Sequence, residues 1–588
     1  MFDNGSSPPA GRAGFALRFL GHGLALIRYA AIIAAVWASL RFSDDAVDLV
    51  INSGLLLLPL LLILALSGRI AASLSAAAAI AIFVYALGEM KLRYFDNRLA
   101  VSDFPFLDES ANWIIVARYP LLYGSLIGFI AFALLLMLER RLNTRQVRSM
   151  RASGRARVAA AGLFAALIAF SAVNRHHHQW EVFRDDADCG LLKTCGVVSR
   201  LVYSTAVFEY DPPQHKGDPA YFLERMASLP PTNPTSPSPA PAPATHPDIV
   251  VWLNESTFDP SNYVLPHAQL PHLAMLDIDE HTRGASPLRV HTFGGKTWLS
   301  EFSLLTGLVP DDFGGRRSLV FNAVGPHTSS NLVRLLKSNG YHAVVLMPTF
   351  KRFYGAGRVY EKMGFDEVLT LRDFHEYDAV PGDEWDIATS PRLGEAAIKL
   401  IREHRSGPDA GQPLFLYMLS IMEHAPYLKN TPVSFGLDRS GISKSLAARL
   451  SDYIARLKTL SVAVSGLDRF LQADPRPALL CYFGDHQAYF EEPPPPYKYT
   501  LPDPSFITQY RLRSNFVTAE VPQVPTLDIA FLPSLLADLA GVSEDGHFSA
   551  LSAMRRLCTG KLDDCEDQRL VESYKGYVYS DKLGLLTK

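Results

Sequence analysis

The chain has 588 residues, more than one compact domain usually holds, and a formal net charge of −3. This nearly neutral balance gives no global reason to expect a nucleic-acid partner. Hydrophobic residues make up 48% of the chain, and nearly all the long apolar runs fall within residues 1–175. The sequence therefore divides into an apolar N-terminal part and a C-terminal part with the composition of a soluble protein.

The N-terminal part, residues 1–175, holds five apolar runs long enough to cross a bilayer, which takes about 20 residues. They lie near 20–40, 48–67, 70–90, 117–138 and 157–174. Any one run would also suit a buried helix of a soluble protein, but five in succession favour membrane spans. We therefore predict an N-terminal bundle of five transmembrane helices.

Positive charge between the fourth and fifth runs sets the predicted orientation. Residues 139–157 contain seven arginines, and cytoplasmic loops of membrane proteins are enriched in Lys and Arg. An arginine run can also bind nucleic acid, a role that its place between two spans disfavours. We expect a protein of the bacterial inner membrane with a cytoplasmic N-terminus and a periplasmic region after about residue 175.

Four of the five cysteines form two close pairs on the predicted outer side. Cys189 and Cys195 are six residues apart, and Cys558 and Cys565 are seven apart. Disulfides persist in oxidising compartments, so we predict two local disulfides. A zinc site is the rival interpretation, although no CxxC spacing is present. Cys481 lies in the apolar run ALLCYFG and is expected to be a buried thiol.

Residues 176–247 connect the two parts. The HHHQW sequence at 176–180 could bind a metal, but it is more typical of a membrane interface, where Trp lies at the headgroup level. A Pro-rich run from Leu229 to Pro247 is a semi-rigid spacer. We expect a catalytic domain over 248–545, with a tail at 546–588 that belongs to the same domain.

Beyond the spacer, apolar strands alternate with stretches typical of helices. The strands are read in DIVVWLN, YHAVVLMP, PLFLYML and PALLCYFG, and NLVRLLKSNG is a helix-like stretch that ends at a glycine. This alternation predicts an α/β domain with a mainly parallel central sheet, whose ligands bind beyond the carboxyl ends of the strands. Three strands are followed there by polar pairs: Asn254-Glu255, Glu423-His424 and Asp485-His486.

Carboxylates and imidazoles at one sheet edge suit a divalent cation such as manganese or zinc. Thr297 follows two glycines at the expected start of a helix, where backbone N–H groups favour an anion. A metal ion bound to this hydroxyl would lower its pKa and make it a nucleophile. The alternative is that Thr297 only caps the helix, with Ser300 and Glu301 completing a capping pattern.

Four sequence blocks resemble the lipoteichoic acid synthase and phosphoglycerol transferase family. The blocks are NES at 254–256, GGKTWLSEFSLLTG at 294–307, HAPY at 424–427 and GDH at 484–486. That family belongs to the alkaline phosphatase superfamily and is related to the lipid A phosphoethanolamine transferases. The likeness covers the arrangement of the five spans and the motifs of residues 248–545.

The resemblance implies a site with one divalent metal ion, Mn or Zn, and a threonine nucleophile. The metal ligands are then Glu255, Thr297, Asp485 and His486, with Thr297 as the nucleophile. The resemblance places His424 near the oxygens of the phospho-group, although a lone histidine can also be part of a core.

The resemblance also implies a two-step transfer. Thr297 takes a phospho-alcohol from a membrane phospholipid such as phosphatidylglycerol, and a hydroxyl of a glycan or glycolipid then accepts it. Transfer to water would make the same site a hydrolase. A non-catalytic scaffold is a third possibility, which the intact residue set disfavours. The chain has no CxPSR-like motif, which argues against a formylglycine sulfatase.

The sequence departs from the family in the expected headgroup pocket. Met347 and Pro348 stand where Gram-positive synthases have a histidine. Tyr354 and Arg358 fall roughly where the family has Trp and Arg, so we assign them to substrate binding. Lys296 is assigned there too, although it could instead be solvated. Phosphoglycerol is the expected cargo, and phosphoethanolamine is the alternative.

Overall fold

The computed structural model describes residues 246–428, 434–518 and 521–586 of the C-terminal part, together with 217–230. In the N-terminal part it describes chiefly 29–38, 46–95 and 151–184, with short pieces between 123 and 134 and the single residues 26, 99 and 201. The chain forms two compact units, one of residues 1–93 and 97–209 and one of residues 94–96 and 210–588.

Three long helices are described in the N-terminal unit: α2 (Ala46–Ser67), α3 (Ile70–Phe95) and α7 (Gly154–Arg184). They coincide with the apolar runs predicted near 48–67, 70–90 and 157–174. Arg157 of α7 donates from Nε to the carbonyl oxygen of Ala65 at 2.9 Å and from Nη2 to that of Leu66 at 3.0 Å. These bonds satisfy carbonyl groups that the end of α2 leaves without a helical partner.

Within the described residues, one stretch, Ile70–Lys91, is long and apolar enough to cross a membrane. Tyr29–Ala38 and Asn52–Ser67 are apolar but shorter. Most of the predicted span at 117–138, the arginines at 140–148, the Cys189 and Cys195 pair and most of the Pro-rich spacer lie outside the described residues. The five-helix bundle and the domain boundaries drawn from the sequence therefore stay predictions.

An eight-stranded sheet forms the centre of the C-terminal unit, in the order β4-β3-β5-β1-β6-β7-β2-β8. Its strands are β1 (Asp248–Asn254), β2 (Thr282–Arg289), β3 (His342–Met347), β4 (Glu367–Thr370), β5 (Leu414–Leu419), β6 (Ala478–Gly484), β7 (Ile507–Ser514) and β8 (Leu527–Asp528). The five strands from β4 to β6 are mutually parallel, and β7 is antiparallel to both β6 and β2. The predicted α/β domain with a mainly parallel sheet is confirmed.

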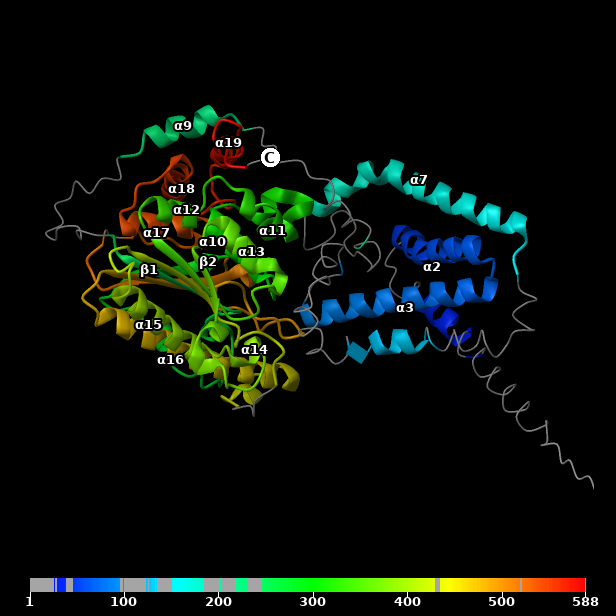
Figure 1. Ribbon diagram of the computed structural model, residues 1–588, viewed down its shortest axis with the longest axis horizontal. Coiled ribbons are helices and arrows are strands. Elements are labelled where there is room, and N and C mark those ends of the chain that lie inside the picture. The colour runs from blue at the N-terminus through cyan, green and yellow to red at the C-terminus, as the bar shows by residue number, and fades with distance from the viewer. Residues whose placement is uncertain are drawn as a thin grey trace, which may run out of the picture. The chain divides into compact units, whose positions relative to one another are not determined.

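Helices cover both faces of this sheet (Figure 1). One face carries α14 (Glu384–Ile387), α15 (Ser390–Ser406) and α16 (Lys444–Gln472). The other carries α10 (Thr297–Thr306), α11 (Val320–Ala323), α12 (Leu332–Ser338), α13 (Ala356–Met363), α17 (Leu532–Ala540) and α18 (Gly546–Leu557), with α9 (Pro219–Ala227) and α19 (Gln568–Val578) beside α18. The strands in the middle are buried on both sides, which explains their unbroken apolar sequences.

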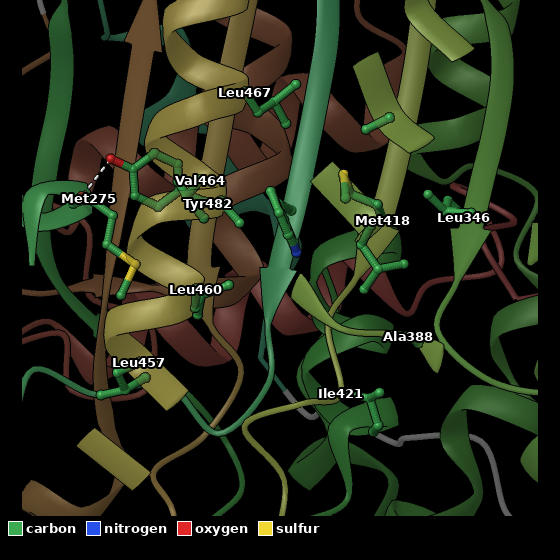
Figure 2. Packing of buried hydrophobic residues seen from close by; sticks show 14 of the residues in the cluster. Met275, Leu346, Ala388, Met418, Ile421, Leu457, Leu460, Val464, Leu467 and Tyr482 are labelled. Carbon is green, nitrogen blue, oxygen red and sulfur yellow. Dashed lines mark hydrogen bonds between the residues drawn. The ribbon is translucent and has the colours of Figure 1, made fainter. Parts of the chain in front are cut away.

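The core between α16 and the sheet holds the central strands in place (Figure 2). Leu457, Leu460, Val464 and Leu467 of α16 are fully buried and belong to the same cluster as Leu346 of β3, Met418 of β5 and Tyr482 of β6. The Tyr482 hydroxyl donates to the carbonyl oxygen of Met275 at 2.6 Å, so its polar atom is satisfied inside the core. The packing fixes β1, β5 and β6, the three strands whose carboxyl ends carry the polar pairs.

Candidate active site

The central strand β1 lies between β5 and β6, so the residues that follow these three strands meet at one edge. Glu255 follows β1, and Asp485 and His486 follow β6. Gly484 allows the close approach, because a Cβ there would lie only 1.9 Å from the carbonyl oxygen of Thr257. The edge thus brings together three side chains that are far apart in the sequence.

Glu255, Asp485 and His486 form a compact, buried cluster. Each can offer one ligand atom, and these atoms lie within 4.8 Å of one another. His486 Nε2 is 3.4 Å from Glu255 Oε1 and 3.3 Å from Asp485 Oδ2. Among the described residues, this is the one group of His, Cys, Asp and Glu side chains with the geometry to hold a metal ion.

The hydrogen bonds around the cluster leave suitable atoms for a cation. His486 Nδ1 is 2.9 Å from the carbonyl oxygen of Gln487, so the N–H group is at Nδ1 and the Nε2 lone pair points to the cluster. Nε2 and Asp485 Oδ2 are both buried without a hydrogen-bond partner. Burial and the charge of Glu255 raise the pKa of Asp485 well above its usual value. A divalent cation would satisfy these atoms, so the residues present fit one.

Thr297 joins this cluster from the start of α10. Lys296 takes the left-handed conformation before the helix, with φ 63°, and provides no side-chain cap. The hydroxyl of Thr297, the first helical residue, donates to Glu255 Oε2 at 3.0 Å. Ser300, one turn later, donates to the backbone carbonyl of Asp485 at 2.6 Å. The capping interpretation of Thr297 therefore does not hold, and the four residues Glu255, Thr297, Asp485 and His486 lie together.

The residues assigned to substrate binding occupy different surroundings. His424 is half-buried after β5, and its ring centroid is 5.3 Å from that of Trp385. Lys296 is half-buried beside Thr297, and Arg358 is exposed on α13. The side chain of Tyr354 is buried, and its ring centroid is 5.5 Å from that of Trp298. Lys296 and Tyr354 thus lie beside α10, and His424 lies after β5.

The contacts of Glu301 with three tyrosines were not predicted from the sequence. Its buried carboxylate accepts hydrogen bonds from Tyr354 at 2.6 Å, from Tyr417 at 3.3 Å and from Tyr360. Burial raises the pKa of Glu301 to about 7, although the three hydroxyls act in the opposite direction. The hydroxyl of Tyr354 is therefore used in a hydrogen bond to Glu301 inside the domain. Glu301 lies within the block at 294–307, but the tyrosines that bond to it are distant from it in the sequence.

Glu423 is a second buried carboxyl group near the cluster. Its Oε1 accepts a hydrogen bond from Ser390 at 2.6 Å, and its Oε2 is buried without a partner. Burial raises its pKa to about 7, and the charge of Glu255 acts in the same direction. The position of Glu423 before His424 was visible in the sequence, but its full burial was not.

Comparisons with known proteins agree with this architecture. The family model for sulfatases matches residues 247–542. An uncharacterized protein of Haemophilus influenzae is 32% identical over 495 residues, which cover 83% of this chain and 87% of that protein. The capsular polysaccharide biosynthesis protein RkpI of Rhizobium meliloti is 24% identical over 240 residues, 41% of each chain.

Solved structures are also similar. Phosphoglycerol transferase GacH of Streptococcus pyogenes matches with a TM-score of 0.48 and 15% identity, over 64% of this chain and 95% of that one. Lipoteichoic acid synthase LtaP of Listeria monocytogenes matches with a TM-score of 0.41 and 13% identity, over 55% and 78%. The periplasmic domain of EcEptC of Escherichia coli, in complex with zinc, gives 0.36 and 17%, over 51% and 84%. Because the sulfatase model matches residues 247–542, half of the chain, the chain belongs to the sulfatase family.

Proposed function

We propose that the chain is a metal-dependent phosphotransferase with Thr297 as its nucleophile. It takes a phospho-alcohol group, phosphoglycerol in the first instance, from a membrane phospholipid such as phosphatidylglycerol. A hydroxyl of a glycan or glycolipid then accepts the group. Phosphoethanolamine is the alternative cargo.

One observation carries the proposal: the Thr297 hydroxyl donates to Glu255 Oε2 at 3.0 Å, beside two buried ligand atoms without partners on Asp485 and His486. A purely structural cluster would satisfy those atoms inside the protein. The nucleophile position also separates this chain from sulfatases that need a modified Cys or Ser, because it holds a threonine.

The residues divide the chemistry among them. Glu255, Thr297, Asp485 and His486 would hold one Mn²⁺ or Zn²⁺, and that ion would stabilise charge on the phosphoryl group and lower the pKa of the Thr297 hydroxyl. Thr297 Oγ1 bonds to phosphorus and releases its proton along the hydrogen bond to Glu255. The bond from phosphorus to the diacylglycerol oxygen breaks, and that oxygen takes up a proton. In the second step the acceptor oxygen bonds to phosphorus and gives up its proton. The bond between phosphorus and Thr297 Oγ1 breaks, and Thr297 Oγ1 takes up a proton.

The other assigned residues would hold the donor. We assign the phosphoryl oxygens to His424 and Lys296, and the edge of the headgroup pocket to Tyr354 and Arg358. Because Tyr354 already donates to Glu301, we expect its ring rather than its hydroxyl to face the headgroup.

A glycan acceptor accords with the relative from Rhizobium meliloti, which is named for capsular polysaccharide biosynthesis. A membrane phospholipid donor accords with the apolar N-terminal unit, which contains the helix Ile70–Lys91. We place the protein in the bacterial inner membrane with its catalytic domain in the periplasm, where both substrates occur.

Mass spectrometry of Thr297 tests the proposal. Purified full-length protein is incubated with Mn²⁺ or Zn²⁺ and with phosphatidylglycerol or phosphatidylethanolamine in separate reactions, and the peptide around Thr297 is analysed. We expect a phosphoglycerol adduct on Thr297 from phosphatidylglycerol. A phosphoethanolamine adduct from phosphatidylethanolamine would identify the alternative cargo. Chelation of the metal and Thr297→Ala should each abolish the adduct, whereas Thr297→Ser retains a hydroxyl and should retain part of the turnover.

The fate of the label distinguishes transfer from hydrolysis. Headgroup-labelled lipid is incubated with the protein in the presence and absence of membrane glycolipids. Label that passes to a glycolipid supports the transferase, whereas label found only as the free phospho-alcohol identifies a hydrolase. Full lipid turnover by Thr297→Ala would refute the assigned nucleophile.

A further inference from the structure

His291 lies between two carboxylates at the start of the loop that leads to Thr297. Its Nδ1 is 3.0 Å from Asp311 Oδ2, and its Nε2 is 3.2 Å from Asp528 Oδ1. Each ring nitrogen thus faces an acceptor, an arrangement that requires a proton on both. Burial alone would lower the pKa of His291, but Asp528 and Asp311 outweigh it and raise that pKa to about 10.

The loop between His291 and Thr297 is fixed at further points. The Thr292 hydroxyl donates to the carbonyl oxygen of Gly295 at 2.6 Å, and the Gly294 N–H donates to that of Gln487 at 3.1 Å. Arg317 donates to the backbone carbonyl of His291. The loop that leads to Thr297 is therefore held at two places. His291 is held at its start, and Gly294 is bonded to Gln487, the residue after His486.

The C-terminal segment reaches the same network through Lys575 of α19. The Lys575 ammonium is 2.7 Å from Asp312 Oδ1 and 2.7 Å from Asp563 Oδ1. Tyr579 donates to Asp312 Oδ2 at 2.8 Å. Lys575 is only 8% exposed, and a buried ammonium requires such carboxylate partners. Asp312 adjoins Asp311 in the 3-10 helix Pro310–Leu319, so Lys575 and His291 contact neighbouring residues of one short element.

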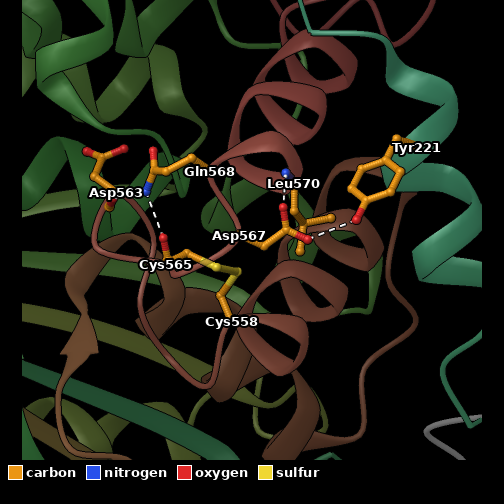
Figure 3. The surroundings of a disulfide bond; sticks show 7 residues. All are labelled: Tyr221, Cys558, Asp563, Cys565, Asp567, Gln568 and Leu570. Carbon is orange, nitrogen blue, oxygen red and sulfur yellow. Dashed lines mark hydrogen bonds between the residues drawn. A yellow bond between two sulfur atoms is a disulfide. The ribbon is translucent and has the colours of Figure 1, made fainter.

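A disulfide closes the part of the tail that supplies Asp563. Cys558 and Cys565 are bonded, and Asp563 lies between them (Figure 3). The same loop contacts the other partner of His291, because the Asp528 N–H donates to the carbonyl oxygen of Gly560 at 2.8 Å. The tail therefore contacts the backbone of Asp528 and the side chain of Asp312, the neighbour of Asp311, which are the two places where the carboxylate partners of His291 join the chain.

We propose that the C-terminal segment is a positioning element for the nucleophile, in which Lys575 and the disulfide loop hold Asp311 and Asp528 against the His291 imidazolium and so fix the loop 291–297. His291 and Lys575 are positioning residues: they act through the loop and touch no reacting atom. The fixing of the loop 291–297 does not depend on which group Thr297 carries. The expected effect on lipid turnover rests on the proposed function.

Hydrogen exchange of the full-length protein in detergent tests the geometric part. Lys575→Met and His291→Gln should each speed amide exchange in the peptide covering 291–297 by about tenfold or more, since a buried charged partner is lost. The peptide of β6, residues 478–484, should exchange as in the wild type. Lys575→Arg keeps the positive charge and should keep the exchange of 291–297 slow. Lys582→Met makes the same change as Lys575→Met at an exposed tail residue and should leave this exchange as in the wild type.

Two results would overturn the inference. One is unchanged exchange of 291–297 in both variants. The other is faster exchange across the whole domain, β6 included, which would show that these residues only stabilise the fold.

Lipid turnover tests the catalytic part separately. With phosphatidylglycerol as substrate, Lys575→Met should lower kcat by about tenfold with little change in KM, because the donor contacts remain in place while the nucleophile is misplaced. A fall in kcat/KM through KM alone would contradict a positioning role. If the wild type turns over no lipid but the exchange pattern holds, the proposed function fails and the positioning inference stands.

Discussion

Glu301 connects α10 to three other elements through one carboxyl group. It lies one helical turn after Thr297 on α10 and accepts hydrogen bonds from Tyr354, from Tyr360 of α13 and from Tyr417 of β5. Tyr354 has a φ of 39°, a conformation that residues with a side chain rarely adopt. The hydrogen bond to Glu301 offsets the cost of that backbone conformation and keeps Tyr354 beside Trp298.

The raised pKa of Glu301 predicts a dependence of stability on pH. Its pKa is about 7 in the folded domain because of burial, against 4.5 for an ordinary Glu. The folded state therefore binds more protons than the unfolded state, so the contribution of Glu301 is fully present below pH 4.5 and is lost as the pH rises through 7. The loss is at most about 1.4 kcal/mol per pH unit.

Thermal unfolding of wild type and Glu301→Gln in detergent, between pH 4.5 and 8, measures this dependence. The midpoint of the wild type should fall relative to that of the variant as the pH rises, because Gln does not titrate. A constant difference between the two proteins over that range would show that Glu301 is already ionised at low pH.

The meeting of Glu255, Asp485 and His486 could be predicted from the sequence because each of them belongs to a local pattern. Glu255 and the pair Asp485-His486 each follow an unbroken apolar strand, and parallel strands present such residues at one edge. The Glu301 cluster could not be predicted in this way. Tyr360 and Tyr417 are 59 and 116 residues away from Glu301, and a tyrosine in an apolar run gives no sign of the group that its hydroxyl contacts.

At the scale of elements, four of the five parallel strands from β4 to β6 were predicted, whereas β4 and the antiparallel edge were not. β2 has the sequence TRGASPLR, which lacks the apolar run of a buried strand and contains both Gly and Pro. Its pairing with β7 over Thr282–Arg289 supplies the order that its own sequence does not. The short strand β8 pairs over only two residues and carries no recognisable pattern.

The packing of α16 against the sheet gives a prediction about stability. Leu460 is fully buried in the cluster shown in Figure 2, so Leu460→Ala removes apolar contacts and leaves a cavity. We expect a loss of about 2–5 kcal/mol in the free energy of unfolding. Val462→Ala on the same helix, where the side chain is 63% exposed, should change it by no more than about 0.5 kcal/mol.

Thermal and urea unfolding of the two α16 variants check this expectation. Because α16 packs against the strands that carry Glu255, Asp485 and His486, Leu460→Ala should also lower the temperature at which the proposed activity is lost. Equal stability of the two variants would mean that the core between α16 and the sheet relaxes to fill the cavity.

At the scale of the whole molecule, two independent features predict the same topology. The arginines of residues 139–157 place that loop in the cytoplasm. The bond between Cys558 and Cys565 belongs in an oxidising compartment, because thiols stay reduced in the cytosol. The single span predicted near 157–174, between this loop and the C-terminal unit, reconciles the two features, since it would put them on opposite sides of the membrane.

Reporter fusions test that topology in whole cells. A reporter enzyme that becomes active only when its own disulfides form should be active when fused after Lys588 and inactive when fused after Arg145. A fluorescent reporter that matures only in the cytoplasm should give the reverse pattern. Activity of the disulfide-dependent reporter at Arg145 but not at Lys588 would invert the membrane orientation, and it would leave the catalytic domain on the side where the glycan acceptor of the proposed reaction is absent.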